Sequence, residues 1–143
     1  MSKIYVVYWS GTGNTKSMAD KIGEGIEAGG KEVQVTDVSD ISPEGLKDEA
    51  VYALGCPSMG AEELEEDSME PFVAGLLPFV AGKKIGLFGS YGWGNCEWMR
   101  DWEERLKKAG AEIVLEEGVT CLNDPDSETL DKCLELGKAL AAL

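Results

Sequence analysis

Short apolar segments alternate with segments of helical periodicity along the whole chain, and this order constrains the fold more than any other feature. The apolar segments, expected to be buried strands, are residues 4–9, 33–38, 50–54, 85–88 and a last one that opens at 113–115. Helices are expected around residues 18–26, 43–47, 69–80, 97–108 and 130–141. Gly29 and Gly30 should end the first of these helices, and Pro78 should end or distort the third. This alternation predicts a doubly wound α/β fold, with helices on both faces of a five-stranded parallel sheet.

Size and charge narrow the class of protein. The length of 143 residues suits one domain over residues 1–143. Asp and Glu number 27 against 13 Lys and Arg, a formal net charge of -14. That charge repels nucleic acid and anionic membranes and favours basic protein partners. Because no apolar run approaches the length of a membrane span and no leader pattern is present, we expect a cytoplasmic protein and a monomer.

Cysteine spacing and the absence of histidine limit the possible chemistry. Cys56, Cys96, Cys121 and Cys133 have no CxxC spacing, and a chain of this length does not need disulfides, so four reduced thiols are expected. Without histidine, the Ser-His-Asp and Cys-His nucleophiles and His-ligated zinc are excluded. We therefore predict no catalytic residue and no metal site.

Three loops of unusual composition follow expected strands, at the edge where parallel sheets bind ligands. They are residues 10–15 (SGTGNT), 55–62 (GCPSMGAE) and 89–95 (GSYGWGN). The first loop opens a helix, so its N–H groups and hydroxyls can hold an anion, although capping and turn formation also explain these residues. It lacks the lysine of a Walker A loop and the GxGxxG of a dinucleotide site. A terminal phosphate held by neutral donors, as in FMN, fits it best.

The third loop presents aromatic side chains that can contact a flat ring. Tyr91 and Trp93 stand among glycines, where exposed aromatic side chains suit stacking on an isoalloxazine ring. Alternatively, Trp93 packs sideways on Trp98 or Met99 and only covers the core.

The second loop combines a thioether with a glycine. Met59 can contact an aromatic ring and Gly60 permits either peptide orientation, although an ordinary turn also explains both residues. The acids that follow favour a solvated face and a negative helix start; they are Glu62, Glu63, Glu65, Glu66, Asp67 and Glu70.

The segments YWSGTGNT (8–15), GCPSMG (55–60) and GSYGWG (89–94) resemble those of short-chain flavodoxins from anaerobic bacteria, of the clostridial and Megasphaera type. The resemblance runs over the whole chain and includes the spacing of the three loops. The sheet order 2-1-3-4-5, with FMN at the switch between strands 1 and 3, is the standard example of this fold and is carried over from the family.

The resemblance also implies roles for individual residues around a non-covalently bound FMN. It implies that loop 10–15 holds the phosphate and that Met59 and Trp93 flank the ring. Glu62 would accept a hydrogen bond from flavin N3, and Gly60 would turn its carbonyl toward N5 when the semiquinone forms. The residues implied to bind FMN are Ser10, Gly11, Thr12, Gly13, Asn14, Thr15, Ser58, Met59, Gly60, Glu62, Ser90, Tyr91, Gly92, Trp93, Gly94 and Asn123.

Two positions depart from the family pattern. Pro57 stands where some relatives carry a serine that reaches the phosphate, and here the hydroxyl comes one residue later, at Ser58. Ala61 stands where some relatives carry an acid, so one charge near the flavin is missing. No relative's redox potential can therefore be transferred to this chain.

The function that the resemblance implies is a low-potential one-electron carrier, not an enzyme, that cycles mainly between the semiquinone and the hydroquinone. Acids near the ring favour a low potential, because their negative charge destabilises the anionic hydroquinone relative to the neutral semiquinone. A unit charge ~10 Å away at an effective dielectric of ~20 contributes ~1.7 kcal/mol to this difference, about 70 mV for a one-electron couple. Its partners would be reductases and acceptor enzymes that dock through basic patches.

Two other functions are possible on the same fold. A small NAD(P)H-dependent flavin or quinone reductase would need basic residues and room for nicotinamide, where this chain has Trp93 and acids. A phosphoacceptor domain would need an acid pair after the first strand and an Asp at the end of the third. This chain has Ser10 and Gly55 at those places.

Overall fold

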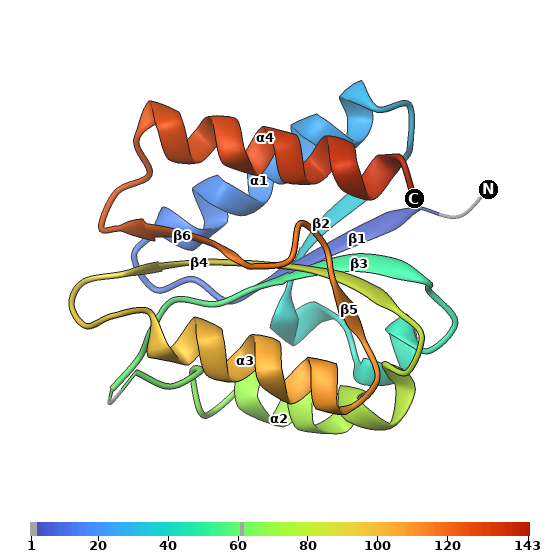
Figure 1. Ribbon diagram of the computed structural model, residues 1–143, viewed down its shortest axis with the longest axis horizontal. Helices are drawn as coiled ribbons and strands as arrows, with labels where there is room; N and C mark the ends of the chain where they lie inside the picture. The colour runs from blue at the N-terminus through green and yellow to red at the C-terminus, as the bar shows by residue number, and fades with distance from the viewer. Residues whose placement is uncertain (1–2, 61) are drawn as a thin grey trace.

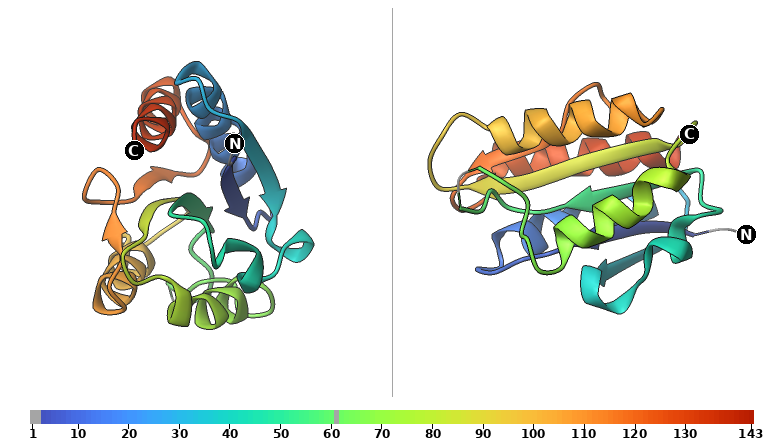
Figure 2. Two further views of the ribbon diagram at one scale, coloured as in Figure 1. Left: turned by 90° about the vertical axis from the view of Figure 1, so that its right-hand side faces the viewer. Right: turned by 90° about the horizontal axis from the view of Figure 1, so that it is seen from below.

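A parallel β-sheet lies between two layers of helices in the computed structural model, which describes residues 3–60 and 62–143 (Figure 1). The strands are β1 (Ile4–Tyr8), β2 (Val33–Asp37), β3 (Val51–Gly55), β4 (Lys84–Tyr91), β5 (Glu112–Ile113) and β6 (Val119–Leu122). The α-helices are α1 (Asn14–Ala28), α2 (Met69–Leu76), α3 (Glu97–Lys108) and α4 (Ser127–Ala141). Helices α1 and α4 cover one face, and α2 and α3 cover the other, as the two views of Figure 2 also show. The expectation for Ala61 lies outside the described residues.

The strand order β2-β1-β3-β4-β5, with every neighbouring pair parallel, confirms the expected flavodoxin-like order. The fifth position, however, is divided between two strands. β5 pairs with Lys84 and Ile85, and β6 pairs with the later part of β4, from Phe88 to Tyr91. The expected strand at 113–115 is therefore wrong beyond Ile113, and the sheet has six strands.

Backbone conformation explains this division. Leu115 and Glu116 have φ angles of 62° and 71°, in the left-handed region that side chains disfavour, and they turn the chain out of the sheet. β4 is also longer than expected and includes residues 89–91, which the sequence pattern had placed in the following loop.

Two apolar cores lie on opposite faces of the sheet. Val6 packs into the core under α1 and α4, and the next residue, Val7, packs into the core under α2 and α3. Because both faces are covered, the inner strands must be apolar at successive positions, as the sequence pattern indicates. Trp98 and Trp102 are each about 1% exposed in the second core, as the periodicity of α3 predicts.

Proline sets the end of α2. The helix stops at Leu76 and continues as a single 3-10 turn, Leu77–Phe79, that contains Pro78. This confirms the expectation for Pro78. The short helix expected at 43–47 is also a 3-10 helix, Pro43–Leu46.

The described residues contain no helix long and apolar enough to cross a membrane. All four cysteines are free thiols, and Cys56, Cys121 and Cys133 are buried. Burial raises the pKa of Cys56 and of Cys133 to about 12, so both thiols stay protonated at neutral pH.

Two glycines bring α1 and α4 into backbone contact. A Cβ at Gly137 would overlap the carbonyl oxygen of Ile22, and a Cβ at Gly25 would overlap that of Leu134. Gly25 and Gly137 are therefore required by packing rather than by helix preference.

Replacing Gly137 with alanine should lower the free energy of unfolding of the apoprotein by roughly 1–3 kcal/mol, because the added methyl group pushes the helices apart. This loss would occur although alanine favours a helix by about 1 kcal/mol. Urea denaturation measures it, with Glu135→Ala, an exposed position on the same helix, as control. A Gly137→Ala protein as stable as the parent would show that α1 and α4 can separate freely.

Candidate functional site

The three loops meet at the carboxyl ends of β1, β3 and β4, at the left of Figure 1. Between them lies a cavity of about 280 Å³. Its lining residues are Trp9, Gly11, Thr12, Asn14, Pro57, Ser58, Met59, Ser90, Tyr91, Gly92 and Asn123. A second cavity, of about 380 Å³, shares Trp9 and Met59 with the first and extends along Gly60 and Glu63 to Asp67. None of the described residues that line the first cavity is charged.

Hydroxyl groups of the loop hold residues 10–15 in place, and Asn14 N donates to Thr12 Oγ1 at 3.5 Å. Ser10 Oγ accepts hydrogen bonds from the N–H of Gly13 at 3.1 Å and from that of Lys16 at 3.3 Å. Gly13 has a φ of 98° and stands at the N-cap of α1, where it offers no side chain to the first turn. The N–H groups of Gly13, Asn14 and Lys16 thus bond to hydroxyls of the loop itself, and an anion at this helix start stays a prediction.

A buried pair of hydroxyls joins the first loop to β4. Thr15 Oγ1 lies 3.3 Å from Ser90 Oγ, and the two residues are 1% and 5% exposed. Ser90 also accepts a hydrogen bond on its carbonyl from Ser58 N, at 3.0 Å. Ser90 therefore connects all three loops at the wall of the cavity.

The second loop is fastened to β4 and α3 at Cys56. Cys56 N donates to Phe88 O at 3.1 Å, and the Cys56 carbonyl accepts from Trp98 Nε1 at 3.0 Å. A Cβ at Gly89 would overlap this carbonyl, so position 89 must be glycine. Beyond Cys56, Met59 and Glu63 exchange two backbone hydrogen bonds of 2.8 Å. They enclose Gly60, which has a φ of 51°.

A buried carboxylate fixes the far end of the second loop. Glu65 is 7% exposed, and its oxygens accept hydrogen bonds from the backbone N–H groups of Asp67, Ser68 and Met69 at 2.7–2.9 Å. These groups form the start of α2, so the carboxylate satisfies donors that the helix cannot. Glu65 therefore belongs to the expected negative helix start, but it is a buried helix cap and not part of a solvated face.

Glu62 caps the start of α3, although it lies in the second loop, far from α3 in the sequence. Its Oε1 accepts from Asn95 N at 3.2 Å and from Glu97 N at 3.0 Å, at the start of α3. Gly94, with a φ of 91°, leaves room for this carboxylate, since a Cβ there would lie 2.5–2.8 Å from its atoms. Oε2 takes part in neither bond, so the contact to flavin N3 stays a prediction.

Trp93 does not cover the core. It is 63% exposed, and Tyr91 is the residue whose ring packs on Trp98, with centroids 5.7 Å apart at 48°. The alternative in which Trp93 packs sideways into the core is wrong for this structure. The neighbouring Cys96 thiol raises the pKa of Tyr91, so its phenol stays neutral at physiological pH.

The structure brings most of the expected residues to the cavity but not all. The expected residues that do not line it are Ser10, Gly13, Thr15, Gly60, Glu62, Trp93 and Gly94. Ser10 and Thr15 support the loops, and Gly60 lines the second cavity. Sequence reasoning missed Trp9 and Pro57 as lining residues. The available signal for Trp9 was its position, directly before loop 10–15 at the end of the first strand.

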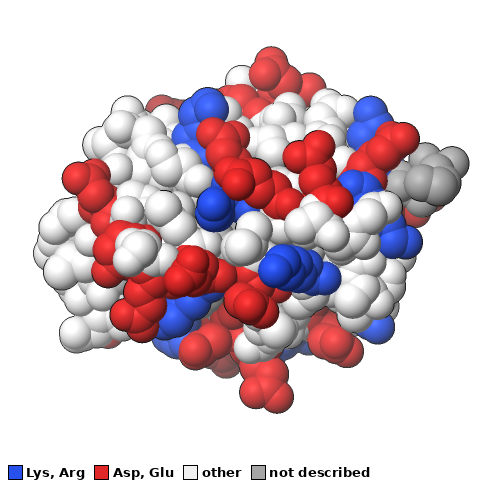
Figure 3. Space-filling view, turned by 90° about the horizontal axis from the view of Figure 1, so that it is seen from above, with Lys and Arg blue, Asp and Glu red and all other residues white. Residues whose placement is uncertain are grey.

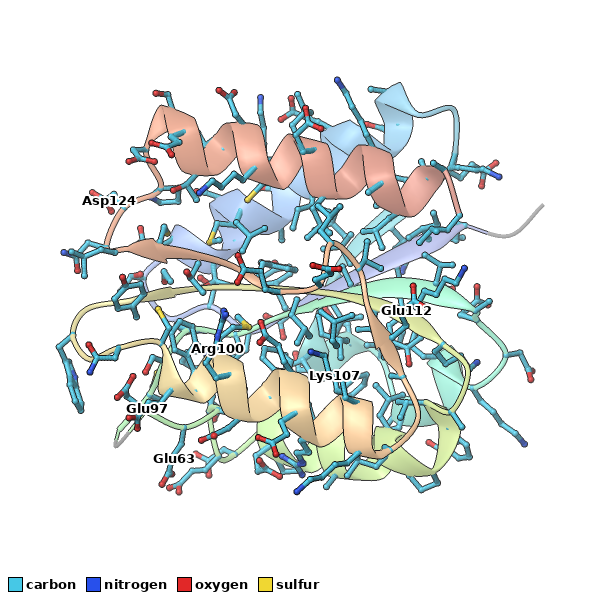
Figure 4. All side chains as sticks on the ribbon, in the orientation of Figure 1. Glu63, Glu97, Arg100, Lys107, Glu112 and Asp124 are labelled. Atoms are coloured by element: carbon cyan, nitrogen blue, oxygen red, sulfur yellow. The ribbon has the colours of Figure 1, made fainter. Side chains whose placement is uncertain are left out.

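Acidic side chains lie near this end of the molecule, but none of the described residues that line the first cavity is acidic. Figure 3 shows mostly uncharged atoms at the left, where the strands end, and acidic side chains over the helices. Glu63, Glu97 and Asp124 lie toward the same end in Figure 4. Uncharged donors together with Trp9, Met59 and Tyr91 suit a molecule with a flat ring and a single phosphate.

Comparison with known proteins agrees with this geometry. The model of the flavodoxin family matches residues 6–137. The chain is 47% identical over 136 residues to a flavodoxin of Clostridium beijerinckii, covering 95% of this chain and 97% of that protein. It is 44% identical over 139 residues to a flavodoxin of Megasphaera elsdenii, covering 96% and 98%.

A solved structure extends the likeness to three dimensions. The solution structure of two-electron reduced Megasphaera elsdenii flavodoxin superposes with a TM-score of 0.90 at 42% identity, covering 98% of this chain and 99% of that one. The chain therefore belongs to the flavodoxin family and is an FMN-based electron carrier, an electron-transfer flavoprotein rather than an enzyme.

Proposed function

We propose that FMN binds in the cavity between the three loops, with its phosphate on loop 10–15 and its ring beside Met59, Tyr91 and Trp93. The observation that carries this proposal is the combination of neutral donors at the start of α1 with an uncharged cavity beside them. A phosphate suits the first, and a flat aromatic ring suits the second. When bound, FMN supplies one-electron chemistry, and the chain supplies its orientation and electrostatics.

We further propose that the carrier works at low potential because of the acids beside the second loop. The hydrogen bonds of the structure divide these acids into two kinds. Glu62 and Glu65 are bonded to the starts of α3 and α2, whose positive ends partly offset their charge. Glu63 and Glu66, next to Gly60 along the second cavity, are better placed to disfavour added negative charge on the ring.

Docking to basic partner surfaces, a monomeric state, a single domain and a cytoplasmic location belong to the same proposal. The net charge of -14 supports basic patches as the complementary surface. Exposed Trp93 and Met59 provide apolar contact area near the proposed cofactor edge. The alternative of an NAD(P)H-dependent reductase is not favoured, since no described residue lining the cavity is basic.

Titration of the apoprotein tests the proposal. FMN should bind roughly tenfold or more tightly than FAD, because the loop accepts a terminal phosphate and no lining residue is placed to hold an adenylate. Riboflavin, which lacks the phosphate, is the matched control and should also bind more weakly than FMN. Quenching of flavin fluorescence measures all three affinities. Equal affinity for FMN and FAD would rule out loop 10–15 as a site for a terminal phosphate.

Replacing Trp93 with alanine should weaken FMN binding by about 1–3 kcal/mol, as expected for the loss of an aromatic contact. The stability of the apoprotein should change little, because the side chain is 63% exposed. Leu143→Ala, at a 50% exposed position at the opposite end of the molecule (Figure 1), should affect neither quantity. The contrary result, lower stability with unchanged affinity, would mean that Trp93 only packs on the protein.

Replacing Gly60 with valine should bring the two one-electron reduction potentials of the bound FMN closer together while the oxidised cofactor stays nearly as tightly bound. A Cβ at Gly60 meets no atom within 4 Å, so the substitution acts through the backbone. It penalises the positive φ that one orientation of the peptide requires, by roughly 1–2 kcal/mol.

Gly82 provides a matched control for this experiment. It has a φ of 80°, also with no atom within 4 Å of an added Cβ, and it does not line either cavity. Gly82→Val should therefore strain the backbone equally without moving the potentials. Spectroelectrochemical titration reads both potentials. If Gly60→Val leaves their separation at the parent value, Gly60 is a turn residue and not a redox-coupled peptide.

A further inference from the structure

The segment between β5 and β6 adopts a conformation that its own residues disfavour. Leu115 and Glu116 are consecutive non-glycine residues whose backbone lies in the left-handed region, with φ angles of 62° and 71°. Such conformations persist where the surrounding structure holds them in place. Gly118, two residues later, is pressed against α3, since a Cβ there would overlap the sulfur of Met99. Some contact with α3 must therefore hold the segment.

Glu103 provides that contact. Its side chain is 8% exposed, and Oε2 accepts a hydrogen bond from Gly118 N at 2.6 Å. The same oxygen lies 3.1 Å from Arg100 Nη2, one turn earlier on α3. Arg100 Nη1 in turn donates to Glu117 at 3.0 Å, so the two residues before β6 are both joined to α3. Figure 4 shows Arg100 extending from α3 toward the sheet.

The Glu103 carboxylate is buried, so the loss of its hydrogen-bond partners would be unfavourable. A carboxylate that is removed from water is unfavourable unless it is paired and hydrogen-bonded. Glu103 meets this condition only while Gly118 N–H and Arg100 are in place. A displacement of the segment would therefore leave a buried charge without its partners, which favours one position of Gly118.

The position of Gly118 sets the strand that follows it. β6 begins at Val119, and its register with β4 pairs Ser90 with Cys121 and Tyr91 with Leu122. The ladder ends where Asn123 N donates to Tyr91 O at 2.7 Å. Asn123 and Tyr91 both line the cavity proposed for FMN. The side-chain hydrogen bond of Glu103 to Gly118 N and the backbone ladder between β6 and β4 thus connect α3 to the wall of the site.

We propose that Glu103 is a positioning residue of the FMN site, which acts from outside the cavity by holding Gly118 so that β6 places Asn123 and Tyr91. The inference rests on the proposed binding of FMN in this cavity. Glu103 does not line the cavity, and its effect on the cofactor passes through β6.

The test compares Glu103→Ala and Glu103→Gln with Leu46→Ala in the FMN-loaded protein. Glu103→Ala should raise the dissociation constant of FMN about tenfold, because the wall formed by Asn123 is no longer held. It should also speed amide hydrogen exchange in residues 118–123, with β1 and β3 still protected. Glu103→Gln keeps an acceptor for Gly118 N–H and should restore most of both properties.

Leu46→Ala is the control for a general loss of stability, because Leu46 is buried in the 3-10 helix Pro43–Leu46 and lines neither cavity. It should leave the FMN affinity and the exchange of residues 118–123 unchanged. If Glu103→Ala behaves like Leu46→Ala in both readouts, Glu103 only stabilises the fold and the proposal is wrong. If exchange in 118–123 rises while FMN affinity stays at the parent value, the contact holds β6 but does not position the site, which also overturns it.

Failure of the proposed function would look different. In that case the parent protein itself would bind FMN no better than riboflavin, whereas failure of the Glu103 proposal leaves the parent's preference for FMN intact.

Discussion

The close approach of β4 to the loop after β3 is the contact on which the rest of the site depends. The Cys56 carbonyl occupies the space that a side chain at position 89 would take, and it accepts the indole N–H of Trp98. One oxygen atom thereby joins the loop after β3, strand β4 and helix α3. The residues that follow Cys56 continue along the site, where Ser58 N donates to Ser90 O and Met59 exchanges two backbone hydrogen bonds with Glu63.

Helix ends decide how the large negative charge is distributed. Glu65 and Glu62 accept backbone N–H groups at the starts of α2 and α3, and Asp126 accepts from Thr129 N at 2.8 Å at the start of α4. The hydrogen bonds from Thr129 lower the pKa of Asp126, as expected when they favour the charged form. Several acids that look like free surface charges in the sequence are thus structural caps. We propose that the electrostatic effect on bound FMN comes mainly from the acids that have no such role.

Local chemistry made much of the fold predictable. The apolar runs mark the strands because a parallel sheet is covered on both faces, and Pro78 marks the end of α2 because it cannot donate to the preceding turn. Loop 10–15 stood out in the sequence because it combines small and hydroxyl residues at a helix start, a composition that suits an anion. The division of the fifth strand was not predictable, since Leu115 and Glu116 carry no local signal for left-handed backbone. Residue preference does not explain that conformation, and the end of the segment is joined to α3 by the hydrogen bond from Gly118 N to Glu103.

The sequence by itself determined the class of fold, the three loops and the kind of ligand they suit, because each depends on residues that are neighbours in the chain. Tertiary structure alone decided which side chains form the cavity wall. Trp9 and Pro57 belong to it, whereas Trp93 stays outside, because these positions depend on how separate loops meet. The same holds for Glu62, Glu65 and Glu103, which nothing in the sequence distinguishes from the other acids near them. Their roles arise from backbone N–H groups that folding brings to them, and periodicity and composition carry no information about those groups.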